Sequence, residues 1–234
     1  MKQRYSYCEF CKADVLYDVI EQQSDINICG KTINYMEKIA RCRYCHHEIF
    51  VMHLMDENIA YTNRLLQEKQ GKIYVVASYL LQHDPKISAL VLQKALYYCQ
   101  GLFYAFHHTF LFENDAQAWV HGPVYKEIYH AFKQQEKQFF PTEPSLNPEE
   151  KEVVDAILRY ICCYRGETLQ QMTHLEQPWL QTRKELPRNT KTDRIIKKDK
   201  IAKFFETIKQ RYAMKQPCDI RLYAQDFMNK IHGS

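Results

Sequence analysis

The sequence predicts a mainly α protein in which a small β ribbon precedes an all-helical C-terminal domain. Three observations carry this prediction: alternating apolar residues between two Cys-x-x-Cys pairs, apolar residues at helical spacing from residue 73 onward, and capping residues with prolines at helix starts. We therefore expect a ribbon over residues 1–54, a helical connector over 55–71 and a helical domain over 72–234.

Composition narrows the function classes. Of the 234 residues, 46% are hydrophobic and 26% are charged, which is the balance of a globular chain. No apolar stretch approaches the roughly 18 residues of a membrane helix, and the first ten residues lack the apolar core of a signal peptide, so we expect a cytoplasmic protein without membrane contact. Six scattered glycines form no phosphate loop, and no nucleophile elbow or zinc-protease helix is present. We therefore expect no enzyme.

The first part of the chain is expected to form short strands. Apolar and polar residues alternate within it, and Cys29-Gly30-Lys31 is typical of a turn between two strands. The apolar members of the alternation are Val15, Tyr17 and Val19, then Ile26 and Ile28, then Ile33 and Tyr35.

Four of the nine cysteines have the spacing of a metal site. Cys8 and Cys11 form one Cys-x-x-Cys pair, Cys42 and Cys45 form the other, and residues 12–41 separate them. Two such turns joined by strands direct four thiolates at one cation, which favours a single structural Zn²⁺ in a closed site. Iron is the alternative metal, and four unrelated buried thiols are the alternative without a metal.

Helical periodicity begins after Gly71. Ser88 can cap a helix whose apolar residues recur at helical spacing to Phe106, Pro123 is expected at the first position of the next helix, and Asn147 with Pro148 is a strong start signal. Two more amphipathic helices are expected around Phe204 and after a cap at Asp219, where apolar residues again recur at helical spacing.

Tyrosines are more numerous around the central helix than a dry core needs, because each buried hydroxyl requires a partner. We expect them to line a partner-binding face, the alternative being rings at the rim of the core with their hydroxyls in water. These residues are Tyr97, Tyr98, Tyr104, Tyr125 and Tyr129. Trp119 is expected as a core anchor, and His121 and His174 as hydrogen-bonding residues rather than acid–base groups.

Three strings place the helical part near a known family. VLQKALYYCQGLFYAF (91–106), AWVHGPVYKEIYHAF (118–132) and TLQQMTHLEQPW (168–179) together resemble the Panacea domain, also called the SocA-like antitoxin domain, from about residue 72 to 212. The four-cysteine ribbon over 1–54 is similar to the N-terminal zinc finger of YgiT-type antitoxins.

The resemblance implies a non-enzymatic antitoxin of a toxin–antitoxin or phage-defence system. It would neutralise a toxin encoded nearby by direct binding, as a homo-oligomer or in a hetero-oligomer with the toxin. The zinc-finger resemblance implies a structural metal and a second contact with the toxin. A SocA-like member also acts as an adaptor for proteolysis, so delivery of a bound partner to a protease is an alternative.

A DNA-binding regulator of its own operon is the other alternative. Residues 181–215 carry twelve basic and four acidic side chains, and weak DNA contact would run through Arg183 to Lys203. The run has no interleaved aromatic residue before Phe204, and solvated charge is its usual role. A metal-dependent hydrolase ranks last, because neither an open metal site nor a nucleophile with a base is visible.

Overall fold

The computed structural model describes residues 5–28, 31–134 and 140–232. The chain divides into two compact units, 1–69 and 70–234, which are described separately. Among the described residues, no helix combines the length and apolarity that crossing a bilayer requires.

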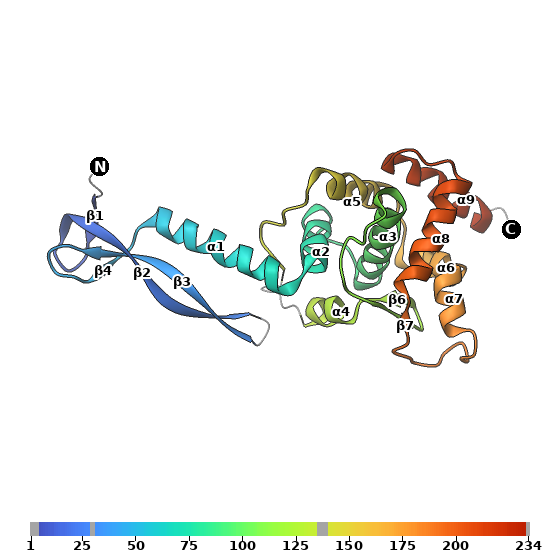
Figure 1. Cartoon of the computed structure of the whole chain (residues 1–234), viewed down its shortest axis with the longest axis horizontal. Coiled ribbons are helices and arrows are strands. Elements are labelled where there is room, and N and C mark those ends of the chain that lie inside the picture. Colours follow the sequence, from blue (N-terminus) through green and yellow to red (C-terminus); the bar gives the residue numbers. More distant parts are fainter. Residues whose placement is uncertain (1–4, 29–30, 135–139, 233–234) are drawn as a thin grey trace. The chain divides into compact units, whose positions relative to one another are not determined.

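The N-terminal unit is an antiparallel ribbon followed by a helix (Figure 1). Its strands are β1 (Tyr5–Cys8), β2 (Ala13–Ile28), β3 (Lys31–Cys42) and β4 (Glu48–Ile49), in the order β1-β2-β3-β4. Helix α1 (Met52–Gln70) follows β4 and begins within the range expected for the ribbon. The expected turn at Cys29 and Gly30 lies outside the described residues.

A small core holds this ribbon together. Val15 and Tyr17 are buried on β2, as the alternation predicts, and they pack in one cluster with Ala40, Ile49 and Leu54. Helix α1 is tied to the ribbon by an amide. The Asn58 side chain accepts a hydrogen bond from the Lys38 N–H at 2.9 Å and donates one to the Lys38 carbonyl at 2.8 Å, so it covers the backbone of β3 at this point.

The C-terminal unit contains eight α-helices among its described residues. In chain order they are α2 (Lys72–His83), α3 (Ala89–His107), α4 (Lys126–Lys133), α5 (Pro148–Tyr160), α6 (Gly166–His174), α7 (Gln177–Arg183), α8 (Lys198–Arg211) and α9 (Ile220–His232), the last preceded by the 3₁₀ turn η2 (Pro217–Asp219). Every residue from Val91 to Phe103 is buried, so α3 is the central helix of this unit, in contact with α2, α4, α5, α6 and α8 (Figure 1).

The expected helix starts at Ser88 and Asn147 are confirmed. Ser88 Oγ accepts a hydrogen bond from the Val91 N–H at 3.3 Å. Asn147 and Glu150 form a reciprocal capping box, with Pro148 in the first turn of α5. Local capping chemistry is sufficient at both positions, which is why the sequence predicts them correctly.

The C-terminal unit is not all-helical, and this part of the fold prediction was wrong. A three-stranded antiparallel sheet, in the order β6-β5-β7, is formed by β5 (Ala116–Trp119), β6 (Gly122–Val124) and β7 (Ile195–Ile196). Strands of two to four residues show no alternation that could be recognised in the sequence. The prediction of a small β ribbon before a mainly helical part is confirmed.

Pro123 lies in strand β6, whereas the sequence placed it at the start of a helix. Gly122 adopts a φ of 102°, which turns the chain back so that Ala118 pairs with Pro123. Strand β6 is at the edge of the sheet, where a proline without an N–H is tolerated. Helix α4 therefore begins three residues later, at Lys126.

Candidate metal centre and candidate binding groove

The four cysteines of the two pairs converge on one point of the ribbon. The Sγ atoms of Cys8, Cys11, Cys42 and Cys45 all lie within 4.8 Å of one another. Cys8 Sγ is 3.5 Å from Cys45 Sγ, and Cys11 Sγ is 3.8 Å from Cys42 Sγ. The convergence follows from the topology, because Cys8 ends β1, Cys42 ends β3, and the turns after these strands carry the other two cysteines. All four are free cysteines.

These separations fit one tetrahedral cation. Four sulfurs at about 2.3 Å from a zinc ion lie about 3.8 Å from one another. The turn after Cys42 also directs donors at its sulfur, since the N–H groups of Tyr44 and Cys45 lie 3.4 and 3.5 Å from Cys42 Sγ. Such hydrogen bonds stabilise a thiolate. The cluster fits a zinc ribbon, and four sulfur ligands would leave the cation no open position.

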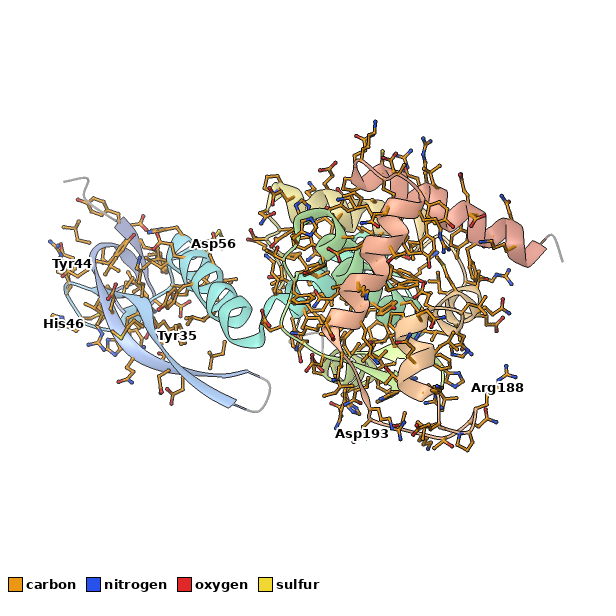
Figure 2. The ribbon with its side chains drawn as sticks, turned by 45° about the vertical axis from the view of Figure 1, so that its right-hand side comes forward. Tyr35, Tyr44, His46, Asp56, Arg188 and Asp193 are labelled. Atoms are coloured by element: carbon orange, nitrogen blue, oxygen red, sulfur yellow. The ribbon has the colours of Figure 1, made fainter. Side chains whose placement is uncertain are left out.

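Both turns use a left-handed residue that is not glycine. Lys12 has a φ of 52° and His46 a φ of 58°, and each directly follows the second cysteine of its pair. Such a conformation costs an L-residue roughly 1 kcal/mol, so two equivalent occurrences indicate that the cysteine turns require it. Figure 2 shows His46 and Tyr44 at the same end of the ribbon.

The pKa values of the cysteine thiols differ. Burial raises the pKa of Cys42, but backbone hydrogen bonds from Cys45 and Tyr44 oppose burial and lower this pKa to about 7. The hydrogen bond with Cys45, followed by burial, raises the pKa of Cys11 to about 12. Four adjacent thiolates repel one another, so only a bound cation allows all of them to ionise together.

The histidines beside the second pair have other contacts. The His47 ring stacks on Phe10 with ring centroids 3.5 Å apart, and its Nδ1 lies 3.1 Å from the Cys45 carbonyl oxygen. His47 therefore braces the two cysteine turns against each other rather than joining the ligand set.

Three of the five tyrosines expected on a partner-binding face lie in the interior, which corrects that expectation. Tyr97, Tyr98 and Tyr125 are 0% exposed. The first two lie on α3, which is buried on all sides, and the third precedes α4 inside the same core. Tyr104 and Tyr129 remain partly exposed, and the Tyr129 ring packs edge-on against Trp119 at 5.1 Å.

A buried polar network lies at the centre of the C-terminal unit. The carboxylate oxygen Oε1 of Glu176 accepts hydrogen bonds from the hydroxyls of Tyr98 at 2.8 Å and Tyr223 at 2.6 Å. Lys94 is 0% exposed and donates to the Pro123 carbonyl at 3.0 Å. The network thus links α3, β6, α9 and the α6–α7 junction.

The two charged members of this network have strongly shifted pKa values. Burial raises the pKa of Glu176 to about 7, although hydrogen bonds from tyrosines and the charge of Lys94 oppose it. Burial lowers the pKa of Lys94 to about 7, against the charge of Glu176. The cost of holding either charge in the interior makes both groups easy to neutralise.

Gly122 is required beside this network. A Cβ at Gly122 would lie 2.7 Å from both Lys94 Nζ and Thr173 Oγ1, and the backbone has a φ that side chains rarely adopt. The Gly-Pro pair thereby lets β6 approach the buried ammonium closely enough to accept its hydrogen bond.

The two histidines differ in surroundings. His121 Nδ1 lies 3.1 Å from Gln170 Oε1, as expected of a hydrogen-bonding residue. His174 stacks on Trp179 with centroids 4.0 Å apart, and burial lowers its pKa to about 4. Its Nε2 has no hydrogen-bond partner among the described residues. His174 is therefore a neutral packing residue at ordinary pH.

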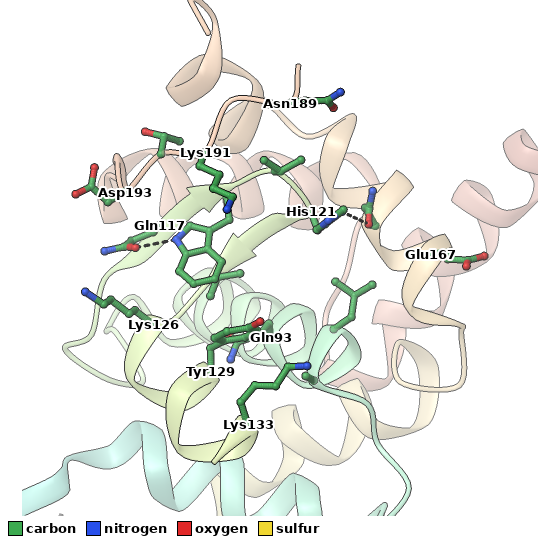
Figure 3. Close-up of a pocket in the computed structure, with 17 residues that line it drawn as sticks. Gln93, Gln117, His121, Lys126, Tyr129, Lys133, Glu167, Asn189, Lys191 and Asp193 are labelled. Carbon is green, nitrogen blue, oxygen red and sulfur yellow. Dashed lines mark hydrogen bonds between the residues drawn. The ribbon is translucent and has the colours of Figure 1, made fainter. Parts of the chain in front are cut away.

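A groove with a volume of about 1140 Å³ opens on the C-terminal unit (Figure 3). Its walls come from the starts of α3 and α6, from β5, β6, α4 and the loop between α7 and β7. Trp119 and Tyr129 line it, so Trp119 is a partly exposed groove residue rather than the expected core anchor. The indole Nε1 of Trp119 donates to Gln117 Oε1 at 2.8 Å, which fixes the ring (Figure 3).

The loop that forms one wall is held by a buried arginine. Arg183 is 5% exposed, donates to the Ala118 carbonyl at 2.7 Å and lies with its guanidinium 5.3 Å from the Trp179 ring centroid. Its Nη2 donates to the carbonyls of Arg188 at 3.1 Å and Thr190 at 2.8 Å. Arg183 is thus a structural residue and not part of an exposed basic run.

The fold and the sites define a two-unit protein, with a four-cysteine ribbon and a mainly helical unit built on a buried polar network. Residues 92–180 match the family model of the antitoxin SocA-like, Panacea domain. The matched residues lie within the C-terminal unit, and they include Lys94, the Gly122-Pro123 turn and Glu176. No curated protein and no solved structure matches the chain significantly.

Sequence reasoning missed the buried polar side chains and the groove. Gln93, Lys94 and Gln100 occur in a helix that has apolar residues on every side, and this is the one signal that could have marked them as buried. The groove has no such signal, because its walls come from segments separated by up to a hundred residues.

Proposed function

We propose that this protein is an antitoxin that neutralises a toxin encoded by a neighbouring gene through direct, stoichiometric protein–protein binding. The match of residues 92–180 to the SocA-like Panacea domain carries this proposal. The family supports a non-enzymatic role. The polar groups at the centre of the unit are consistent with that role, because Glu176 and Lys94 are buried and engaged with the fold.

The ribbon is proposed to hold one structural Zn²⁺ through Cys8, Cys11, Cys42 and Cys45. The sulfur separations and the N–H donors directed at Cys42 support zinc, with iron as the alternative. The ribbon core contains few residues, so the metal would supply most of its stability. The ribbon would then present a second contact to the toxin, which raises affinity through effective concentration.

Co-expression tests the antitoxin proposal. The product of the neighbouring gene is expressed from an inducible foreign promoter, with and without this protein, and growth is followed together with co-purification. We expect growth to be rescued and the two proteins to purify as a complex of fixed stoichiometry. Absence of rescue, or rescue at strongly substoichiometric amounts without a complex, would contradict sequestration.

The design separates the two alternatives as well. Rescue that occurs only when the toxin is transcribed from its native promoter indicates repression, for which Arg188, Lys191 and Arg194 offer exposed cations on one loop. Rescue accompanied by disappearance of the toxin protein indicates delivery to a protease. Rescue from the foreign promoter with an intact, co-purifying toxin supports neutralisation by binding.

A further inference from the structure

The groove on the C-terminal unit has the properties of a binding site for a polypeptide segment. Its volume of about 1140 Å³ is close to the upper end of the roughly 300–1,000 Å³ that is typical of ligand pockets, so it has room for a short polypeptide segment. Trp119, Tyr129, Val124 and Leu90 give it apolar surface, and side-chain amides from Gln117 and Gln170 stand among them. Aromatic rings beside amides suit a peptide, which offers both side chains and backbone groups.

The groove has a basic rim. Lys126 and Lys133 of α4 and Lys191 of the loop between α7 and β7 line it, and all three are exposed (Figure 3). Two acidic side chains, Glu167 and Asp193, also line it. Cations therefore exceed anions by one, and they come from two segments, α4 and the loop between α7 and β7, which favours a ligand that carries negative charge.

The backbone adds to this positive character. The first residues of α3 and α4, Ala89 and Lys126, line the groove, as does Glu167 in the first turn of α6. Three helices thus direct their positive ends toward the same space. Glu167 offsets this at α6 and Glu127 at α4, whereas the first turn of α3 carries no acidic residue.

A buried donor at the groove has no acceptor. Gln93 lines the groove, is 2% exposed, and uses its Oε1 to accept the Tyr125 N–H at 2.7 Å. Its Nε2 has no hydrogen-bond partner among the described residues. A buried amide donor without an acceptor costs about 1–3 kcal/mol, and a ligand carbonyl or carboxylate would remove that cost. Figure 3 shows Gln93 among the residues that line the groove.

The groove is preorganised. Arg183 holds the 184–194 loop through its backbone carbonyls, and this loop carries Lys191 and Asp193. The hydrogen bond from Trp119 to Gln117 fixes the aromatic wall. A site whose walls are already held loses little conformational entropy on binding.

We propose that this groove binds an extended, acidic segment of the toxin. An apolar side chain of the segment packs against Trp119 and Tyr129, its carboxylates pair with the rim lysines, and one of its oxygens accepts from Gln93 Nε2. The inference rests on the proposed function, because it takes the neutralised toxin to be the occupant.

The test reverses charge at the rim of the full-length protein. In Lys126→Glu/Lys191→Glu, affinity for the purified toxin, measured by calorimetry, should fall at least about tenfold. The matched control is Lys184→Glu/Lys203→Glu, which makes the same charge change at exposed lysines that do not line the groove. It should stay within about twofold of the unaltered protein. Circular dichroism and the thermal midpoint establish that both variants fold.

A second experiment uses peptides in place of the toxin. It tests the groove independently of the proposed antitoxin function. A random peptide library displayed on phage is selected on the full-length protein and counter-selected on Lys126→Glu/Lys191→Glu. Enrichment of peptides with acidic residues beside an apolar one supports the groove even if the neighbouring gene product proves not to be a toxin. No enrichment, enrichment of basic peptides, or equal loss of toxin affinity in both charge variants overturns the inference. Tight binding of ATP that is lost in the rim variant would also overturn it, in favour of a small anion.

Discussion

At the scale of single residues, Glu176 is a buried carboxyl group that connects three parts of the C-terminal unit. It is 3% exposed, joins the hydroxyls of Tyr98 and Tyr223, and leaves its Oε2 without a hydrogen-bond partner among the described residues. Lys94 compensates part of its charge. A carboxyl group in such surroundings specifies how α3, α9 and the α6–α7 junction assemble, at a cost in desolvation.

The raised pKa of Glu176 predicts a pH signature. A carboxyl whose pKa rises from 4.5 unfolded to about 7 folded binds its proton more tightly in the native state. Its contribution to stability is therefore lost as the pH rises from about 4.5 to 7. Glu176→Gln removes this loss. It also removes the carboxylate that raises the pKa of Lys94, so Lys94 loses its proton in the folded protein at lower pH, which likewise makes the variant relatively more stable as the pH rises. The free energy of unfolding of Glu176→Gln, relative to the unaltered protein, should increase across this range in urea titrations. A difference that stays constant with pH would contradict the raised pKa.

At the scale of elements, the approach of α3 to α8 depends on a glycine inside a helix. A Cβ on Gly101 would lie 2.0 Å from Cδ2 of Phe205. That ring is 0% exposed and is held edge-on by Tyr97 at 5.5 Å and Tyr98 at 5.8 Å, so it has no room to move. The glycine allows close contact between the two helices.

Gly101→Ala should therefore destabilise the protein despite the better helix propensity of alanine. Overpacking of a rigid core costs about 1–3 kcal/mol, and we expect the free energy of unfolding to fall by an amount in that range. Phe205→Leu in the same chain should recover part of the loss by shortening the ring. The control Gln210→Ala, at an exposed position on α8, should change stability by less than about 0.5 kcal/mol. A neutral or stabilising Gly101→Ala would show that the helices are not closely packed there.

At the scale of the whole molecule, the two units have separate cores. The ribbon cluster includes Cys8, Cys42 and Leu54, whereas the core of the C-terminal unit begins at Ile73. Among the residues that the structure describes, none belongs to both clusters. The units should therefore lose their structure independently of each other.

Removing the metal should affect only one unit. We expect about one zinc per chain by elemental analysis, and loss of that zinc in Cys8→Ser or after chelation. Because a structural site contributes on the order of 10 kcal/mol to folding, the ribbon should unfold while the C-terminal unit keeps its melting transition. Cys163→Ser, at an exposed free cysteine of the C-terminal unit, is the control and should retain the metal. A single melting transition that shifts as a whole in Cys8→Ser would contradict two independent cores. One iron per chain in the elemental analysis would contradict the assignment of zinc.

The sequence by itself determined the features that depend on neighbouring residues. Two Cys-x-x-Cys pairs define the candidate metal ligands because each turn is local, and Ser88 and Asn147 define helix starts because a cap needs only the next three residues. Alternation placed Val15 and Tyr17 on the buried side of the ribbon for the same reason.

The tertiary structure alone decided what depends on distant segments. It placed Pro123 in an edge strand by pairing it with Ala118. It also buried Tyr97 and Tyr98 on α3, and Tyr125 before α4, in one core. It also assembled the groove and the Glu176 network, whose members are brought together only by packing. Local sequence patterns show which face of a helix or strand is apolar, whereas the burial of each side chain depends on how many other elements cover that face.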